Sequence, residues 1–128
     1  MATPIFPPGG DPSGLKHAIV VSRNGGGVGT TTHINVSGDT TTVIQTVGSG
    51  PVHAGLLPGN SRTYVANRDS DSISQYTTFL GSAAPNTISL PAGSAPVFVH
   101  TTQTTNVYVA NSGTNTVGVI LVAGNLLT

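Results

Sequence analysis

The sequence contains no cysteine and no glutamate, and these two absences limit the reactions that its side chains could catalyse. Without cysteine there is no disulfide framework and no thiolate chemistry. The four carboxylate side chains are all aspartates, and the chain has no Gly-x-Ser-x-Gly elbow. The parts of a nucleophilic or paired-carboxylate enzyme are missing, so we expect a non-enzymatic protein; a lyase-like enzyme is kept only as a third hypothesis.

Charge is scarce as well, because only 6% of the residues are charged and the formal net charge is zero. Nucleic-acid phosphates require a basic surface, so we expect no nucleic-acid partner. No apolar run reaches the roughly eighteen residues of a membrane span, and the N-terminus resembles no signal peptide. A neutral surface rich in Thr and Asn is typical of secreted material. We therefore predict an extracellular or cell-envelope location, with a leader removed or outside this sequence.

What the chain does contain is 17 glycines, nine prolines and many Thr, Ser and Asn residues. Leu, Lys and Glu, which favour helices, are few. These residues favour short strands joined by turns, so the predicted fold class is all-β.

A repeat organises this β-rich chain. Residues 62–76 read as a strand, a polar turn and a second strand, and the pattern returns at residues 106–120, with Tyr108 following Tyr64 by 44 residues. A degenerate copy begins near Ile19, 45 residues before Tyr64. This period is that of β-propeller blades, which have four antiparallel strands each. The predicted division is a Pro/Gly-rich lead-in at 1–16 and blades at 17–50, 51–95 and 96–128.

The turn signals divide each predicted blade into short strands. The expected strands are 5–6, 17–22, 32–37 and 41–47 in the first blade, 52–57, 62–67, 72–79 and 86–90 in the second, and 97–102, 106–111, 116–122 and a truncated 126–128 in the third.

Two of the repeats carry a family resemblance. Tyr64-Val65-Ala66-Asn67 and Tyr108-Val109-Ala110-Asn111, with the strand that follows each and the preceding Pro51 and Pro96, resemble the YVTN family of β-propeller repeats. The resemblance implies the propeller fold. It implies no particular activity, since such repeats occur in proteins of diverse function.

Three blades are too few for a closed propeller, which has about 4–8. Apolar blade faces and strand edges would be left open to water. We therefore expect either copies of the chain to complete a ring or filament, or a longer polypeptide to supply further blades. Residues 1–16 of one copy could also pair with the truncated last blade of another by strand addition.

A glycine-rich segment at residues 24–32 is a candidate recognition loop, at Gly25, Gly26, Gly27, Gly29 and Thr30. It lacks the Lys of a phosphate-binding loop, and glycine is favoured in any hairpin turn that needs positive φ. We predict a long hairpin loop, which could contact a glycan or peptide.

Two further groups could bind a ligand. Asn67, Asp69 and Asp71 place oxygens at alternate positions of a turn, as in calcium sites, although no Gly or Glu completes the pattern and turn chemistry explains them better. His53 and His100 share parity on the innermost predicted strands and could line a channel. The alternative, which we favour, is histidines wedged between blades and bonded to the backbone.

The sequence thus predicts a non-enzymatic extracellular or cell-surface protein whose blades associate with copies of itself. The alternative is a propeller fragment that binds a glycan or peptide. No cofactor is expected, apart from the calcium that the 67–71 turn could hold.

Overall fold

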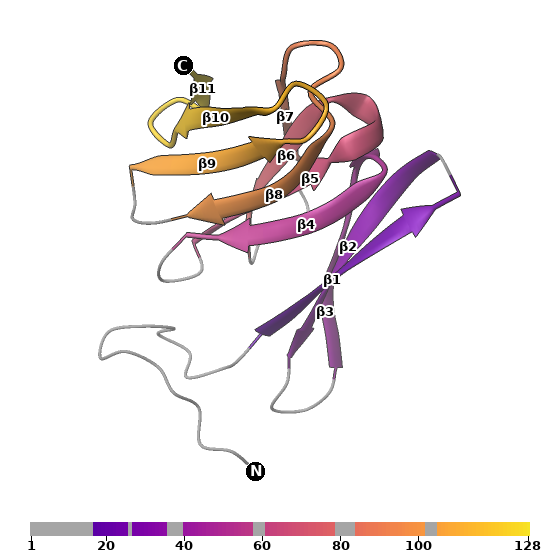
Figure 1. The fold of residues 1–128 in the computed structure, drawn as a ribbon. Helices are drawn as coiled ribbons and strands as arrows, with labels where there is room; N and C mark the ends of the chain where they lie inside the picture. The colour runs from indigo at the N-terminus through magenta and orange to yellow at the C-terminus, as the bar shows by residue number, and fades with distance from the viewer. Residues whose placement is uncertain (1–16, 26, 36–39, 58–60, 79–83, 102–104) are drawn as a thin grey trace.

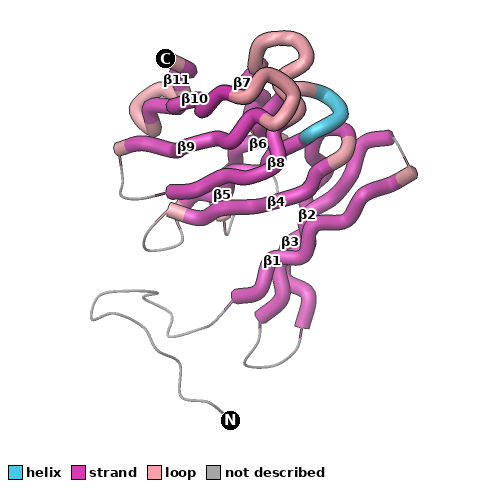
Figure 2. Tube along the Cα trace, viewed as in Figure 1, coloured by secondary structure: helices cyan, strands magenta, loops and turns pink. Residues whose placement is uncertain are grey.

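A computed structural model describes residues 17–25, 27–35, 40–57, 61–78, 84–101 and 105–128. The described chain is all-β apart from one short 3-10 turn at Arg68–Ser70, drawn in cyan in Figure 2. None of the described residues forms a helix long and apolar enough to cross a membrane. The predicted lead-in at 1–16, its strand at 5–6 and its proposed role in strand addition lie outside the described residues.

The strands form three antiparallel sheets that follow one another along the chain. We name these sheets blade 1, blade 2 and blade 3. Blade 1 contains β1 (His17–Asn24), β2 (Gly27–Asn35) and β3 (Thr40–Ser49). Blade 2 contains β4 (Pro51–Leu56), β5 (Arg62–Asn67), β6 (Ser72–Thr77) and β7 (Asn86–Ser89). Blade 3 contains β8 (Pro96–Thr101), β9 (Asn106–Asn111), β10 (Thr116–Leu121) and β11 (Leu126–Leu127).

Blades 2 and 3 repeat the same register. Ala66 pairs with Ile73 in blade 2, and Ala110 pairs with Val117 in blade 3. The hairpins β5–β6 and β9–β10 each contain a residue in the left-handed region, Asp71 at φ 47° and Asn115 at φ 54°. Asp and Asn tolerate this conformation better than other non-glycine residues, which explains the polar turns that mark the repeat.

The blades stack in a row, with β1 beside β4 and β4 beside β8 (Figure 1). The larger apolar cluster lies between blades 2 and 3, and Val47, Val65 and Tyr76 form a smaller one between blades 1 and 2. Each fully buried aliphatic side chain contributes about 1.5–3 kcal/mol, so the faces between blades supply most of the packing energy. The row does not close into a ring (Figure 1).

Blade 1 differs from the other two. Its described strands number three, and none of the described residues pairs with the second edge of β1. β1 points in the direction opposite to β4, as β5 does within blade 2 (Figure 1). β1 therefore occupies the second-strand position, and the position equivalent to β4 and β8 is not filled by described residues.

The prediction of a long glycine-rich loop was wrong in its extent. β2 begins at Gly27, so Gly27, Gly29 and Thr30 lie within a strand and only Gly25 and residue 26 separate Asn24 from Gly27. Gly25 has φ 51°, which a tight hairpin turn requires. Gly29 is fixed by packing, because a Cβ there would lie 2.3 Å from the ring of Pro51. Position 26 itself is outside the described residues.

Candidate functional site

The turn between β5 and β6 is held by Asn67. This side chain is fully buried, and its Nδ2 donates hydrogen bonds to Ser72 Oγ at 3.2 Å and to Ser74 Oγ at 2.9 Å. In blade 3 the equivalent Asn111 donates to Thr116 Oγ1 at 3.3 Å. Asparagine at the end of the repeated Tyr-Val-Ala-Asn segment thus ties together the two strands of its hairpin.

The two aspartates of this turn reach in different directions. Asp69 forms ion pairs with Arg68 at 3.0 Å and with Arg23 of β1 at 3.1 Å. Asp71 accepts hydrogen bonds from the backbone N–H groups of Gly93, at 2.8 Å, and Ala95, at 2.7 Å. One carboxylate therefore contacts blade 1, and the other holds the connection that leads into blade 3.

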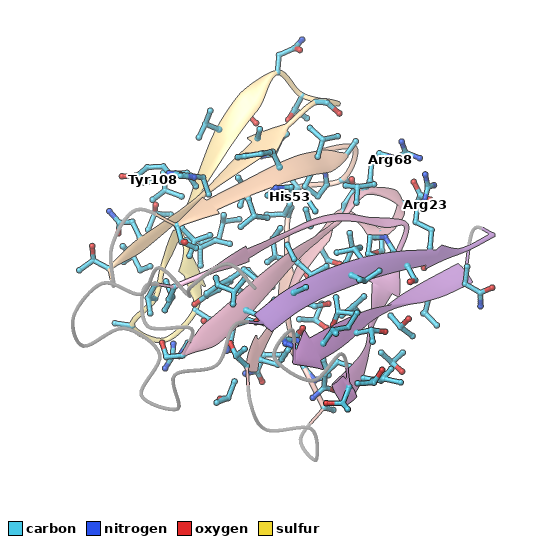
Figure 3. All side chains as sticks on the ribbon, turned by 90° about the horizontal axis from the view of Figure 1, so that it is seen from below. Arg23, His53, Arg68 and Tyr108 are labelled. Atoms are coloured by element: carbon cyan, nitrogen blue, oxygen red, sulfur yellow. The ribbon has the colours of Figure 1, made fainter. Side chains whose placement is uncertain are left out.

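These contacts favour the ionised form of both carboxyl groups. The hydrogen bond from Arg68 is the main cause that lowers the pKa of Asp69, and the backbone N–H of Ala95 has the same role for the pKa of Asp71. Figure 3 shows Arg23 and Arg68 together on one side of the molecule. The carboxylates of two predicted calcium ligands, Asp69 and Asp71, thus have protein partners. The third, Asn67, is held through its Nδ2, and its buried Oδ1 has no hydrogen-bond partner among the described residues. In the described part of the chain, no three His, Asp, Glu or Cys side chains cluster as metal ligands would.

His53 and His100 meet through Phe98, at the place where β4 lies beside β8. The rings of His53 and Phe98 stack with centroids 4.1 Å apart, and the ring of His100 lies 6.4 Å from that of Phe98. His53 Nδ1 accepts a hydrogen bond from the backbone N–H of Val99 at 3.2 Å. Burial lowers the pKa of His53, and the charge of His100 lowers it further. His53 therefore has the contacts of a histidine wedged between two blades and bonded to the backbone.

A polar contact that the sequence did not predict joins blades 1 and 2. The Tyr76 hydroxyl lies 2.6 Å from Thr31 Oγ1 and 2.5 Å from His33 Nε2, and all three side chains are buried. Burial raises the pKa of Tyr76, so the hydroxyl stays protonated and available as a donor. No spacing rule connects residues of two different strands in two different sheets, so the sequence gives no signal for this contact.

A second unpredicted polar group lies between blades 2 and 3. Gln75 Oε1 accepts from Asn125 Nδ2 at 2.8 Å and from Asn86 Nδ2 at 3.0 Å, and Arg62 donates to the Val122 carbonyl at 2.9 Å. Beside these side chains is a pocket of about 210 Å³. Its lining is mostly polar and consists of Arg62, Gln75, Tyr76, Thr77, Ala84, Asn86 and Asn125.

The carboxylates and the histidines singled out in the sequence lie in different parts of the described structure. The carboxylates of Asp69 and Asp71 lie at the hairpin end of blade 2 and are engaged by Arg23, Arg68 and backbone N–H groups. His53 and His100 lie on the first strands of blades 2 and 3, where their contacts are with the Phe98 ring and, for His53, the backbone N–H of Val99. What the arrangement offers instead is packing surface and polar hydrogen-bonding groups.

Comparison with known proteins identifies the fold. The chain matches no known protein family and no curated protein in sequence. Its structure is similar to that of Kuenenia stuttgartiensis hydrazine synthase, a protein that contains a β-propeller, with a TM-score of 0.69 at 21% identity. The match covers 86% of this chain but only 33% of that one, so this chain spans about a third of its neighbour's length. The blades are propeller-like.

Proposed function

We propose that this protein is a non-enzymatic structural or interaction protein that assembles with copies of itself through its blades. The main support for this proposal is that the row of three blades has an exposed apolar face at each end. On blade 3, Val117 is 67% exposed, and on blade 1, Ile44 is 60% exposed. Contiguous exposed apolar residues on a sheet face mark an interaction surface. YVTN-type repeats are consistent with this role, because each such blade buries its faces only against neighbours.

An extracellular or cell-envelope location is part of the proposal. It is supported by the low charge and by the many Thr, Ser and Asn residues of the sequence. The proposed assembly assigns no role to calcium, and the two carboxylates of the turn at 67–71 are engaged by arginine side chains and backbone N–H groups.

Sedimentation of the purified chain over a wide concentration range tests the proposal. We expect association into discrete rings or filaments, and electron microscopy of the same material would separate the two forms. A chain that stays a folded monomer at every concentration would sink the proposal.

A second candidate is glycan binding, which the pocket beside Arg62 favours. Amide side chains and an arginine donate and accept the hydrogen bonds that sugar hydroxyls use. A glycan array should be probed with the native chain and with Asn86→Ala, which removes an amide from the pocket. Thr87→Ala, on the next exposed residue outside the lining, is the matched control. Loss of an array signal in Asn86→Ala alone would support the candidate, and silence of the native chain would count against it.

A further inference from the structure

The outward side of blade 3 carries a defined apolar face. Alternation along β9 and β10 places Tyr108, Ala110, Val117, Val119 and Leu121 on one side of the sheet, as the pairs Ala110–Val117 and Tyr108–Val119 show. We call these five residues the open face of blade 3. None carries a charge, and Val117 and Leu121 are exposed. The residues between them, such as Val109 and Ile120, are fully buried against blade 2.

The same face exists in blade 2, where it is covered. Tyr64, Ala66 and Ile73 occupy the positions of Tyr108, Ala110 and Val117, and all three are 0% exposed. Blade 3 covers them through Val107, Val109 and Ile120, which belong to the same apolar cluster. The interface between blades 2 and 3 therefore shows what this kind of face binds, which is the opposite face of a neighbouring blade.

The chain presents such an opposite face at its other end. On blade 1, Val20 pairs with Thr32 and Thr32 pairs with Ile44, so the three side chains form one row across the sheet. We call Val20, Val28, Thr32 and Ile44 the open face of blade 1. Its three apolar members are all exposed. The other side of the same sheet, with Thr31, His33, Gln45 and Val47, is buried against blade 2.

We infer that the open face of blade 3 in one copy packs against the open face of blade 1 in a second copy. The contact would continue the row in the order that the chain already uses, with each blade covering the next. Neither face contains a charged residue, so stacking them buries no unpaired charge. The inference rests on the proposed self-assembly and adds which two surfaces meet.

A contact between unlike faces has a consequence for the assembly. Heterologous contacts generate a ring if the rotation closes and a filament if it does not. Two copies would bring about six blades together, within the usual range of about 4–8 for closed propellers. A contact between two copies of the same face would instead produce a two-fold symmetric dimer, in which that face is no longer available for further association.

Single-cysteine variants test which faces meet, because the native chain has no cysteine to interfere. Val117→Cys and Ile44→Cys each place one thiol on one open face. Both positions are exposed, so the variants should keep the circular dichroism spectrum and the melting temperature of the native chain. Each variant alone and their equimolar mixture would be treated with a short bis-maleimide and analysed on denaturing gels.

We expect a cross-linked dimer in the mixture and no cross-linked dimer with either variant alone. Dimer formed by Val117→Cys alone would show that like faces meet and would overturn the inference. Native chain that associates in sedimentation, with no cross-linking in the mixture, would overturn it too while leaving self-assembly intact. Native chain that sediments only as a monomer would instead remove the proposed function itself.

Discussion

Blades 2 and 3 have equivalent faces that differ in burial, because the face is covered in blade 2 and open in blade 3. Tyr64 of blade 2 is 0% exposed, whereas Tyr108 at the equivalent position of blade 3 is only partly buried. Ile73 is fully buried, whereas its equivalent Val117 is exposed. Figure 3 shows Tyr108 at the far side of the molecule from Arg23. Place in the row, and not residue type, decides which copy of the repeat becomes core.

The comparison also explains why β5 is buried along most of its length while β9 alternates. Five of the six residues of β5 are buried, because blade 1 covers one side and blade 3 the other. In β9 only every second residue is buried, because one side faces no described neighbour. A central blade contributes two interfaces to stability and a terminal blade one.

The largest expected effect comes from truncating the same repeat position in the two blades. Ile73→Ala removes a fully buried side chain and should lower the free energy of unfolding by about 2–5 kcal/mol. Val117→Ala acts on an exposed side chain and should change it by less than about 0.5 kcal/mol in the monomer. Urea unfolding at a concentration low enough to prevent association measures both values. Equal losses would show that the two faces are equally covered and would break the comparison.

A smaller effect is expected at the repeated tyrosines. The Tyr64 hydroxyl donates to Oδ1 of the half-buried Asn125 at 3.1 Å, and burial raises the pKa of Tyr64, so the hydroxyl stays protonated as a donor. Tyr64→Phe therefore leaves this acceptor with one partner fewer. We expect a loss of about 0.5–1.5 kcal/mol. Tyr108→Phe is the matched control, since among the described residues the Tyr108 hydroxyl has only a long contact, at 3.5 Å, with Asn106 Nδ2. Thermal unfolding of the two variants, side by side, checks the difference.

The smallest effect concerns pH at the junction of blades 2 and 3. Because burial lowers the pKa of His53 in the folded chain, the unfolded chain binds the proton more readily. Well above the ordinary histidine pKa of about 6.5, His53 is neutral in both states and does not affect the free energy of unfolding. As pH falls below that value, proton binding by the unfolded chain lowers the free energy of unfolding. Melting temperatures measured from neutral to mildly acidic pH should fall less steeply in His53→Gln than in the native chain. An unchanged slope in His53→Gln would contradict the assignment.

Much of the fold could be predicted because the repeat depends on residues that are close together in the sequence, such as those of each turn. The hairpin β9 to β10 starts and ends within a residue of its predicted bounds, since Asn111 and Asn115 mark the turn. The glycine-rich segment misled the prediction because glycine is equally compatible with a loop and with a strand that another blade approaches closely. Gly29 is in the second situation, against Pro51, and that contact joins residues of different sheets.

The sequence predicted the histidine pair but not the polar contacts between blades. His53 and His100 were paired by parity along their strands, and the structure does bring them to one place, where Phe98 lies between them. The polar groups around Tyr76 and Gln75 had no signal in the sequence. Their partners, Thr31 and Asn125, come from other blades and are set by how the sheets stack.

The sequence by itself determined that the chain makes short antiparallel strands in a repeated unit, because turn residues and alternating apolar residues act over a few positions. Only the tertiary structure decided which side of each unit is covered. That choice depends on contacts between sheets about 45 residues apart, such as the 45-residue separation between Thr31 and Tyr76, and local patterns do not encode them. The repeat specifies a face that requires a neighbour, and the row of blades shows where that neighbour is still absent among the described residues.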